Sequence, residues 1–182
     1  MRYCIHTVYS TFYSFVTRVT HNKGINILKK FVVILTALLA LLVGLWTQQS
    51  FKVDFISLDG QEHRWDNSQG KWKVVNYFAE WCAPCLREMP ELNYFHQQYS
   101  EDIDIFAVSF DPLSKDKLIP LQQKYNIQFP IIERLNTMPW VRPPNSLPTT
   151  YILDADGKVL KQLKGEQSAE KLMQTINLLK AL

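Results

Sequence analysis

Glycine, cysteine and N-terminal acidic side chains are scarce in this 182-residue sequence. Six glycines and nine prolines are too few for a collagen-like chain or a flexible linker, and 20% charged residues exclude a highly charged disordered chain. Three cysteines are too few for a fold that depends on several disulfides. With 47% hydrophobic and 13% aromatic residues, the sequence can instead bury the core of one globular domain.

The net charge of +3 originates in the first 30 residues. These carry five basic side chains and no acid, so residues 31–182 hold the other 15 basic and all 17 acidic side chains, a net charge of −2. That larger part has no basic stripe with interleaved aromatic residues. We therefore expect no nucleic acid among the partners.

A long uncharged stretch lies between Lys30 and Lys52, and residues 31–46 are almost purely apolar. Sixteen helical residues span about 24 Å, close to the hydrocarbon core of a membrane, and the polar residues that follow reach the headgroups. We predict a transmembrane anchor over residues 31–50. A cleaved signal peptide is the alternative, but the small-residue cleavage site that it needs is missing. The basic residues just before the span predict that the N-terminal side is cytoplasmic and that residues 51–182 lie outside the cytoplasm. Residues 1–30 are then a cytoplasmic tail, or the product of a start codon set too far upstream.

The remaining 132 residues alternate strand-like and helix-like segments. The patterns predict a hairpin over 51–65, strands over 73–78, 103–110 and 129–132, a hairpin of 149–153 with 158–163, and helices over 83–99, 115–125 and 169–179, the last capped by Ser168. Pro120 should delay the start of the second helix or kink it. This order predicts one α/β domain, a three-layer sandwich with a mixed central sheet and helices on both faces.

The Cys82-Ala-Pro-Cys85 segment falls between a predicted strand and a predicted helix. A zinc site would need four ligands, and the sequence has no second cysteine pair, while His63 and His96 are isolated. Covalent haem attachment would need a histidine directly after the pair, where Leu86 stands. The remaining chemistry, a redox-active dithiol, needs only two thiols close enough to form a disulfide.

The spacing of the two cysteines suits thiol–disulfide exchange. Residues three apart face the same side of a helix, and Cys82 at the helix N-terminus meets unpaired N–H groups that stabilise a thiolate. Cys85, one turn further along, should stay protonated until it is needed. Pro84 fits the first helical turn. An inert disulfide closing so short a loop would stabilise little, so we predict that Cys82 and Cys85 are catalytic and require no metal or organic cofactor.

Residues 78–85 (FAEWCAPC) resemble the active site of thioredoxins, and the resemblance extends from about Asp54 to the C-terminus. Within that fold the sequence is most similar to the membrane-anchored TlpA/ResA-like thiol–disulfide oxidoreductases. Asn76 replaces the buried aspartate of cytoplasmic thioredoxins, as in this branch, and Pro90 stands where the family's helix kinks. The resemblance implies that Pro148 is cis and faces the cysteines, and that Glu88 is an acid placed beside them.

The resemblance also implies a location and partners. The protein would be a single-pass protein of the bacterial inner membrane, with its catalytic domain in the periplasm or extracytoplasmic space. Its substrates would be protein disulfides or dithiols, and a membrane electron donor of the DsbD/CcdA type would recharge it. Cytochrome c biogenesis is a common task of similar proteins. Substrate contacts are expected at Trp81, Pro84, Leu147 and Pro148.

Several alternatives remain open on the sequence alone. The protein is predicted to be a reductase, but the same cysteines would serve a DsbA-like oxidase, or a copper chaperone binding Cu(I) through two thiolates with Met138 nearby. Trp81 either packs over a hairpin or forms an exposed aromatic lip, and Glu88 is either a proton relay or an ordinary surface charge. Trp140 and the prolines around it line a partner groove or stiffen a loop, and we favour stiffening.

Overall fold

The computed structural model describes residues 27–49, 53–66 and 70–182, with residues 28 and 45–49 described by their backbone alone. The chain divides into two units, Met1–Lys52 and Val53–Leu182. The described part of the first unit is helix α2 (Ile27–Gln49). Across the described residues, no helix combines the length and apolar character needed to cross a membrane. The predicted anchor over 31–50 is described only in part, and most of the predicted tail over 1–30 lies outside the described residues.

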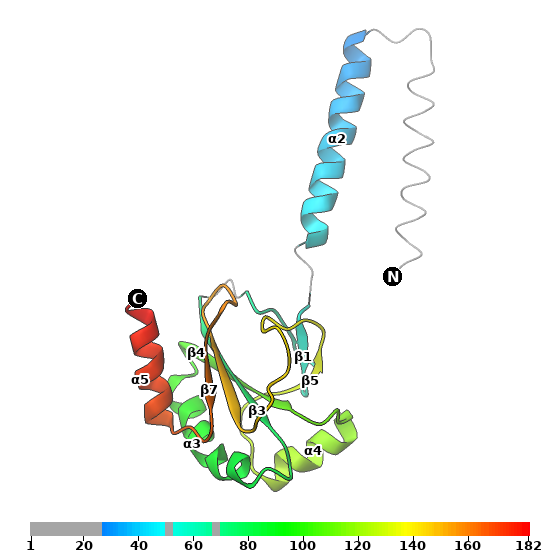
Figure 1. The fold of residues 1–182 in the computed structure, drawn as a ribbon. Helices are drawn as coiled ribbons and strands as arrows, with labels where there is room; N and C mark the ends of the chain where they lie inside the picture. Colours follow the sequence, from blue (N-terminus) through cyan, green and yellow to red (C-terminus); the bar gives the residue numbers. More distant parts are fainter. Residues whose placement is uncertain (1–26, 50–52, 67–69) are drawn as a thin grey trace. The chain divides into compact units, whose positions relative to one another are not determined.

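The second unit contains a seven-stranded mixed sheet and three helices (Figure 1). In chain order the elements are β1 (Phe55–Ser57), β2 (Glu62–His63), β3 (Trp72–Phe78), α3 (Ala83–Tyr99), β4 (Ile103–Ser109), α4 (Lys115–Lys124), β5 (Ile131–Leu135), β6 (Thr149–Leu153), β7 (Val159–Lys164) and α5 (Ala169–Lys180). The strand order is β2-β1-β5-β4-β3-β6-β7. Strands β3, β4 and β5 run parallel, and the remaining pairs are antiparallel, which confirms the predicted mixed sheet.

Most predicted elements are confirmed, with two differences. Strand β5 begins at Ile131 rather than at residue 129, because Phe129 is buried in the core before pairing with β4 begins. Helix α4 does not start late, since it begins at Lys115 and includes Pro120. Pro120 lies on the exposed side of the helix, where water can satisfy the one carbonyl that loses its hydrogen bond.

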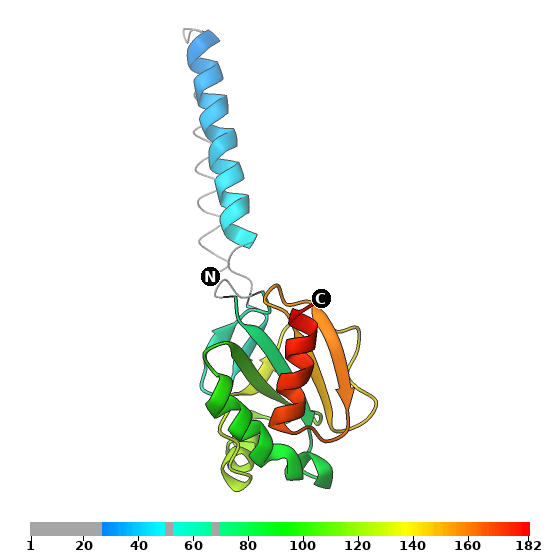
Figure 2. The same cartoon turned by 90° about the vertical axis from the view of Figure 1, so that its left-hand side faces the viewer.

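The helices do not cover both faces of the sheet as predicted. All three supply buried side chains to one cluster, here called the helix-side cluster, and Figure 2 shows α3 and α5 in front of the sheet. The chain steps from β3 through α3 to β4, and on through α4 to β5, always in the same direction across the sheet. Right-handed crossovers in one direction place both helices on the same face, and α5 joins them by packing against α3.

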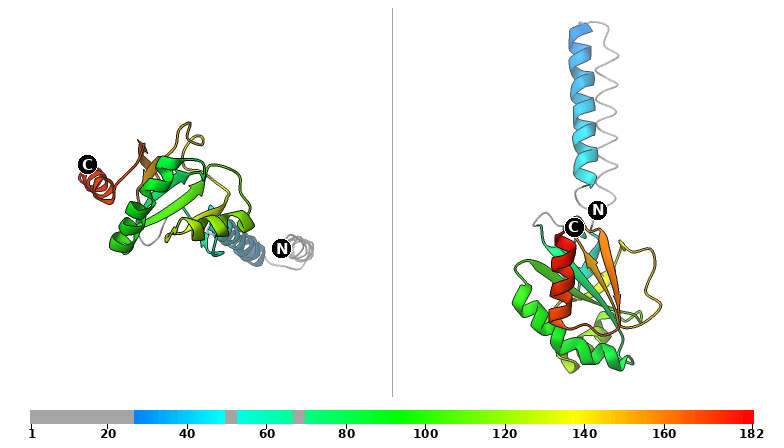
Figure 3. Two further views of the ribbon diagram at one scale, coloured as in Figure 1. Left: turned by 90° about the horizontal axis from the view of Figure 1, so that it is seen from below. Right: turned by 60° about the vertical axis from the view of Figure 1, so that its left-hand side comes forward.

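The opposite face carries an aromatic cluster instead of helices among the described residues of the second unit. Its buried members are Phe55, Trp65, Val75, Tyr77, Phe106, Val108, Ile132, Trp140, Tyr151 and Leu153. Trp140 comes from the long connection between β5 and β6, and its ring stacks on Tyr151 with centroids 4.8 Å apart. The connection thus covers this face of the sheet, and Figure 3 gives two further views of it.

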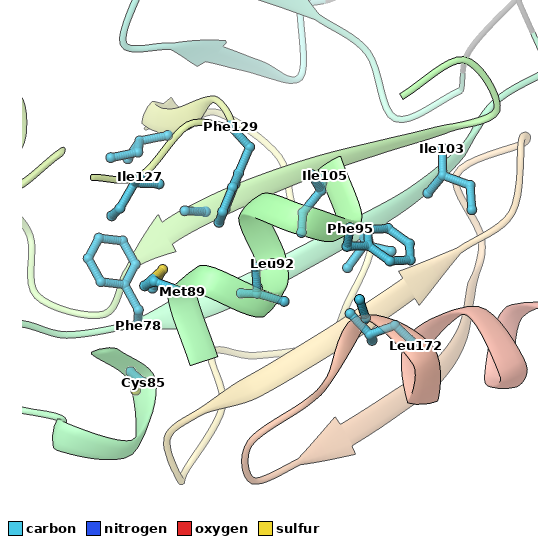
Figure 4. Packing of buried hydrophobic residues seen from close by; sticks show 14 of the residues in the cluster. Phe78, Cys85, Met89, Leu92, Phe95, Ile103, Ile105, Ile127, Phe129 and Leu172 are labelled. Carbon is cyan, nitrogen blue, oxygen red and sulfur yellow. The ribbon is translucent and has the colours of Figure 1, made fainter. Parts of the chain in front are cut away.

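Helix α3 starts at the predicted redox pair and extends along the core. Cys85, Met89, Leu92 and Phe95 follow one another along its buried side, as Figure 4 shows. The helix continues through Pro90, which lies on its exposed side. The packing of this row fixes the start of α3 relative to β3, and so fixes the position of the cysteine pair.

Candidate active site

Cys82 and Cys85 form a disulfide at the start of α3, with Cα atoms 5.3 Å apart. Cys82 is the N-cap of the helix, and its Sγ accepts a hydrogen bond from the backbone N–H of Cys85 at 3.3 Å. Both side chains are almost completely buried, Cys82 at 5% exposure and Cys85 at 0%. The predicted position is therefore confirmed, and the N–H group that would stabilise a Cys82 thiolate is already directed at the sulfur.

Glu88 is buried one turn after Cys85 on the same helix, and is not a surface charge. Its Oε1 accepts a hydrogen bond from the Asn76 amide, and its Oε2 accepts one from the backbone N–H of Gln167, both at 2.8 Å. Burial raises the pKa of Glu88 from 4.5 to about 7, against the smaller lowering effect of these two hydrogen bonds. A carboxyl group with this pKa can hold or release a proton near neutral pH.

Asn76, Thr150 and Gln167 complete a buried polar network around Glu88. The Asn76 amide nitrogen also donates to the Thr150 hydroxyl at 3.1 Å, while Asn76 Oδ1 has no partner among the described residues. Sequence reasoning singled out Asn76 by its resemblance to the family but missed Thr150 and Gln167. Gln167 is 79 residues from Glu88 and contributes its backbone, so no residue pattern could have revealed it.

Trp81 forms an exposed lip beside the cysteines rather than packing over a hairpin. Two thirds of its side chain (66%) is exposed. Its indole N–H donates to Asp111 at 2.9 Å, and its ring meets Phe110 edge-on. Pro84 is half-buried in the first turn of α3, as predicted. Asp111, which sequence reasoning missed, fixes the orientation of Trp81.

The Leu147-Pro148 peptide bond is cis, as the resemblance implied. Pro148 is buried and Leu147 half-buried, and β6 begins at the next residue, Thr149. The Pro148 carbonyl accepts a hydrogen bond from Gly165 at 2.9 Å. Among the described residues, none donates a hydrogen bond to the Leu147 carbonyl.

Met138, considered above as a third copper ligand, lies in the connection between β5 and β6. The Met138 sulfur approaches the Tyr77 hydroxyl at 3.9 Å, within the segment that packs on the aromatic cluster. Throughout the described ranges, no group of three or more histidine, cysteine, aspartate or glutamate side chains is placed to hold a metal ion.

Comparison with known proteins identifies the family. The profile of the AhpC/TSA family matches residues 47–174. This chain belongs to that family. Its curated relatives include the thiol-disulfide oxidoreductase ResA of Geobacillus thermodenitrificans, 32% identical over 70% of this chain and 75% of the relative. Another is the thioredoxin-like protein YneN of Bacillus subtilis, 27% identical over 72% of this chain and 78% of the relative. The TlpA/ResA-like resemblance is thereby confirmed.

Solved structures confirm the thioredoxin-like fold of this AhpC/TSA member. StoA of Bacillus subtilis matches 68% of this chain and 93% of its own, with a TM-score of 0.54 and 21% identity. The lipoprotein thioredoxin Etrx1 of Streptococcus pneumoniae matches 68% of this chain and 96% of its own, with a TM-score of 0.55 and 20% identity.

Proposed function

We propose that this thiol–disulfide oxidoreductase reduces disulfides of client proteins outside the cytoplasm. The observation that carries the proposal is the Cys82–Cys85 disulfide at the start of α3, within the family match. A redox pair on a helix N-terminus provides a stabilised thiolate and a second sulfur one turn away. Relatives named thiol-disulfide oxidoreductase support the same chemistry.

The reaction proceeds through two exchanges on the reduced enzyme. The Cys82 thiolate attacks one sulfur of the client disulfide, forming a mixed disulfide, and the client's other sulfur leaves as a thiolate that takes up a proton. Cys85 then loses its proton and attacks Cys82 Sγ, which releases the second client thiol. The client gains two electrons and two protons, and the enzyme is left with the Cys82–Cys85 disulfide. A dithiol donor must then reduce the pair again.

A trapping experiment with the full-length chain tests this assignment of roles. Cys85→Ser should accumulate covalent mixed disulfides with clients, because Cys82 can attack but nothing resolves the bond. Cys82→Ser, the matched control, should accumulate none. Non-reducing electrophoresis of cells treated with acid to stop exchange measures both, and mass spectrometry of the trapped partners identifies the clients. Equal trapping by the two variants would refute the assignment.

The direction of exchange depends on the redox potential of the pair. Neither residue between the cysteines adds a charge or a histidine that would stabilise a thiolate strongly, which favours a reductase over a DsbA-like oxidase. A redox titration against glutathione or dithiothreitol buffers should give a potential nearer the −270 mV of thioredoxin than the −120 mV of DsbA. A value close to that of DsbA would reverse the proposed direction.

The proposal includes an inner-membrane location, with residues 31–50 as the anchor and a donor of the DsbD/CcdA type. It rests on the uncharged sequence between Lys30 and Lys52, and on the exposed apolar side chains of α2, among them Phe31, Leu35 and Leu39. The same cell samples test it, since complexes trapped by Cys85→Ser should sediment with the membrane fraction. Recovery of cytochrome c precursors among them would add cytochrome c biogenesis to the proposed function.

Clients are proposed to bind at the start of α3, where Cys82 keeps the small exposed part of the cysteine pair. Trp81 and Pro84 would contact the client on one side, and Leu147 and Pro148 on the other. The unpaired Leu147 carbonyl can accept a hydrogen bond from the client backbone, which would align an extended segment beside Cys82. The proton that Cys85 must lose has a nearby acceptor in Glu88, buried on the same helix.

A further inference from the structure

A pocket of about 490 Å³ lies beside the first half of β4. Strand β5 pairs with β4 only at Ala107 and Val108, so β3 is the only described strand that pairs with residues 103–106. Residues 61–64, around β2, line the pocket together with residues 104–106 of β4. The pocket therefore forms where the sheet is incomplete, and its volume falls within the range of pockets that hold small molecules.

Lys73 of β3 also lines this pocket, and it is the one cationic side chain that is buried within the described ranges. Only 2% of it is exposed, and its ammonium group has no hydrogen-bond partner among the described residues. The other described lysines and arginines of the second unit are in contact with water, so they need no partner from the chain. The buried Glu88, by contrast, receives two hydrogen bonds. A buried lysine without a partner is exceptional, because its three N–H donors lose water and gain no acceptor.

The carboxylates nearest to Lys73 are paired with other residues. Asp66 is bonded to Arg64 at 2.8 Å, and Asp104 forms an ion pair with Lys71 at 3.5 Å. Burial lowers the pKa of Lys73 from its usual 10.5, and the negative charge of Asp104 acts in the opposite direction. Lys73 thus remains a desolvated amine in the wall of a pocket, with no described residue to accept its hydrogen bonds.

The other charges of the pocket limit its ligand to a single negative charge. Three acids are among its described lining residues, Glu62, Asp66 and Asp104, and together they would repel a dianion. A carboxylate carries one charge and can accept a charge-assisted hydrogen bond from the Lys73 ammonium. The Nδ1 atom of His96, also buried in the lining without a described partner, can bond a hydroxyl group of the same ligand.

We propose that this pocket binds a small hydroxy-carboxylate, with the Lys73 ammonium as the counter-ion of the carboxylate. Lys73 stands near the start of β3, and the cysteine pair follows the end of that strand, so the strand separates them by about 17 Å. The pocket is therefore a second site, and its ligand takes no part in the exchange steps. Binding would give the ammonium group the partner that the fold does not supply.

The test compares glycolate with glycolamide, which has nearly the same size and the same hydroxyl group but no charge. The thermal unfolding midpoint of the oxidised full chain is measured against the concentration of each compound, at constant ionic strength. Glycolate should raise the midpoint by about 3 °C at saturation, because it binds only the folded state, and glycolamide should leave it unchanged. In protein carrying isotope-labelled lysine, the Nζ NMR resonance of Lys73 should shift over the same glycolate concentrations.

Lys73→Met provides the variant, and its loss of one resonance assigns the Nζ signal. Lys161→Met is the matched control, the same change at an exposed position of β7. Lys73→Met should lose the response to glycolate. Without ligand its midpoint should be at least as high as that of wild type, because methionine removes a buried cation that has no partner. Lys161→Met should keep the response, and both variants should keep the rate of thiol–disulfide exchange within about twofold of wild type.

Equal responses of the wild-type protein to glycolate and glycolamide would overturn the proposal, and this comparison does not depend on the folding of any variant. A glycolate response that persists in Lys73→Met would place the anion elsewhere. A midpoint of Lys73→Met far below that of wild type would show that Lys73 serves the fold rather than a ligand. A larger rise with phosphate than with glycolate would overturn the choice of a singly charged ligand.

Discussion

Glu88→Gln should slow the resolution of the mixed disulfide about 100-fold at pH 7, the lower end of the range for a positioned acid–base group. Cys85 attacks only as a thiolate, so its proton must go to an acceptor during the step. The Glu88 carboxyl is one turn away on α3, and its pKa of about 7 suits it to accept a proton near neutral pH. Glutamine keeps the size and one acceptor oxygen but cannot take the proton.

The measurement is a single turnover on a preformed mixed disulfide at Cys82, followed as release of the client thiol between pH 6 and 10. The deficit should shrink as the pH passes the usual thiol pKa of about 8.5, because Cys85 then ionises without help. Glu91→Gln is the matched control, since it removes one carboxylate from an exposed position one turn further along α3. A Glu88→Gln profile that parallels the wild-type profile at every pH would leave Glu88 with a purely structural role.

Local signals in the sequence were sufficient for most elements of the fold. The nearly continuous burial of β3 and β4, the cap at Ser168 and the spacing of apolar residues in α3 follow from short-range patterns in the sequence. The placement of the helices could not be predicted from local signals, because it depends on which strands become neighbours in the sheet. Adjacent crossovers in one direction put α3 and α4 on the same face, and the aromatic cluster with Trp140 covers the other. No periodicity in the sequence reports strand order.

The candidate site divides along the same line. The cysteine pair could be predicted because its two residues are close in sequence, and the cis Pro148 because it belongs to a family motif. The environment of Glu88 could not, since a backbone N–H 79 residues away and an amide 12 residues away satisfy its oxygens. Whether a carboxyl three residues after a cysteine is a surface charge or a buried acid is decided by this long-range packing.

Glu88→Gln should also change how the stability of the oxidised protein depends on pH. The folded-state pKa of Glu88 is about 7, whereas an exposed glutamate has 4.5. Well below pH 4.5, Glu88 is protonated in both the folded and the unfolded state, and its ionisation does not change the free energy of unfolding. Between pH 4.5 and 7 the unfolded chain releases the proton more readily than the folded chain, so wild-type stability falls as pH rises, by about 3 kcal/mol in all.

Glutamine stays neutral over the whole range, and contributions from the other titrating groups cancel in the difference between variant and wild type. The free energy of unfolding of Glu88→Gln, measured by urea without reductant, should therefore gain about 3 kcal/mol relative to wild type between pH 4.5 and pH 8. A constant difference would show that Glu88 ionises as an exposed group does. A difference that moves the other way would mean that the bonds from Asn76 and Gln167 outweigh burial. The expected rise in this difference with pH means that ionised Glu88 lowers stability at neutral pH. Such a cost is consistent with a carboxyl group whose proton takes part in thiol–disulfide exchange.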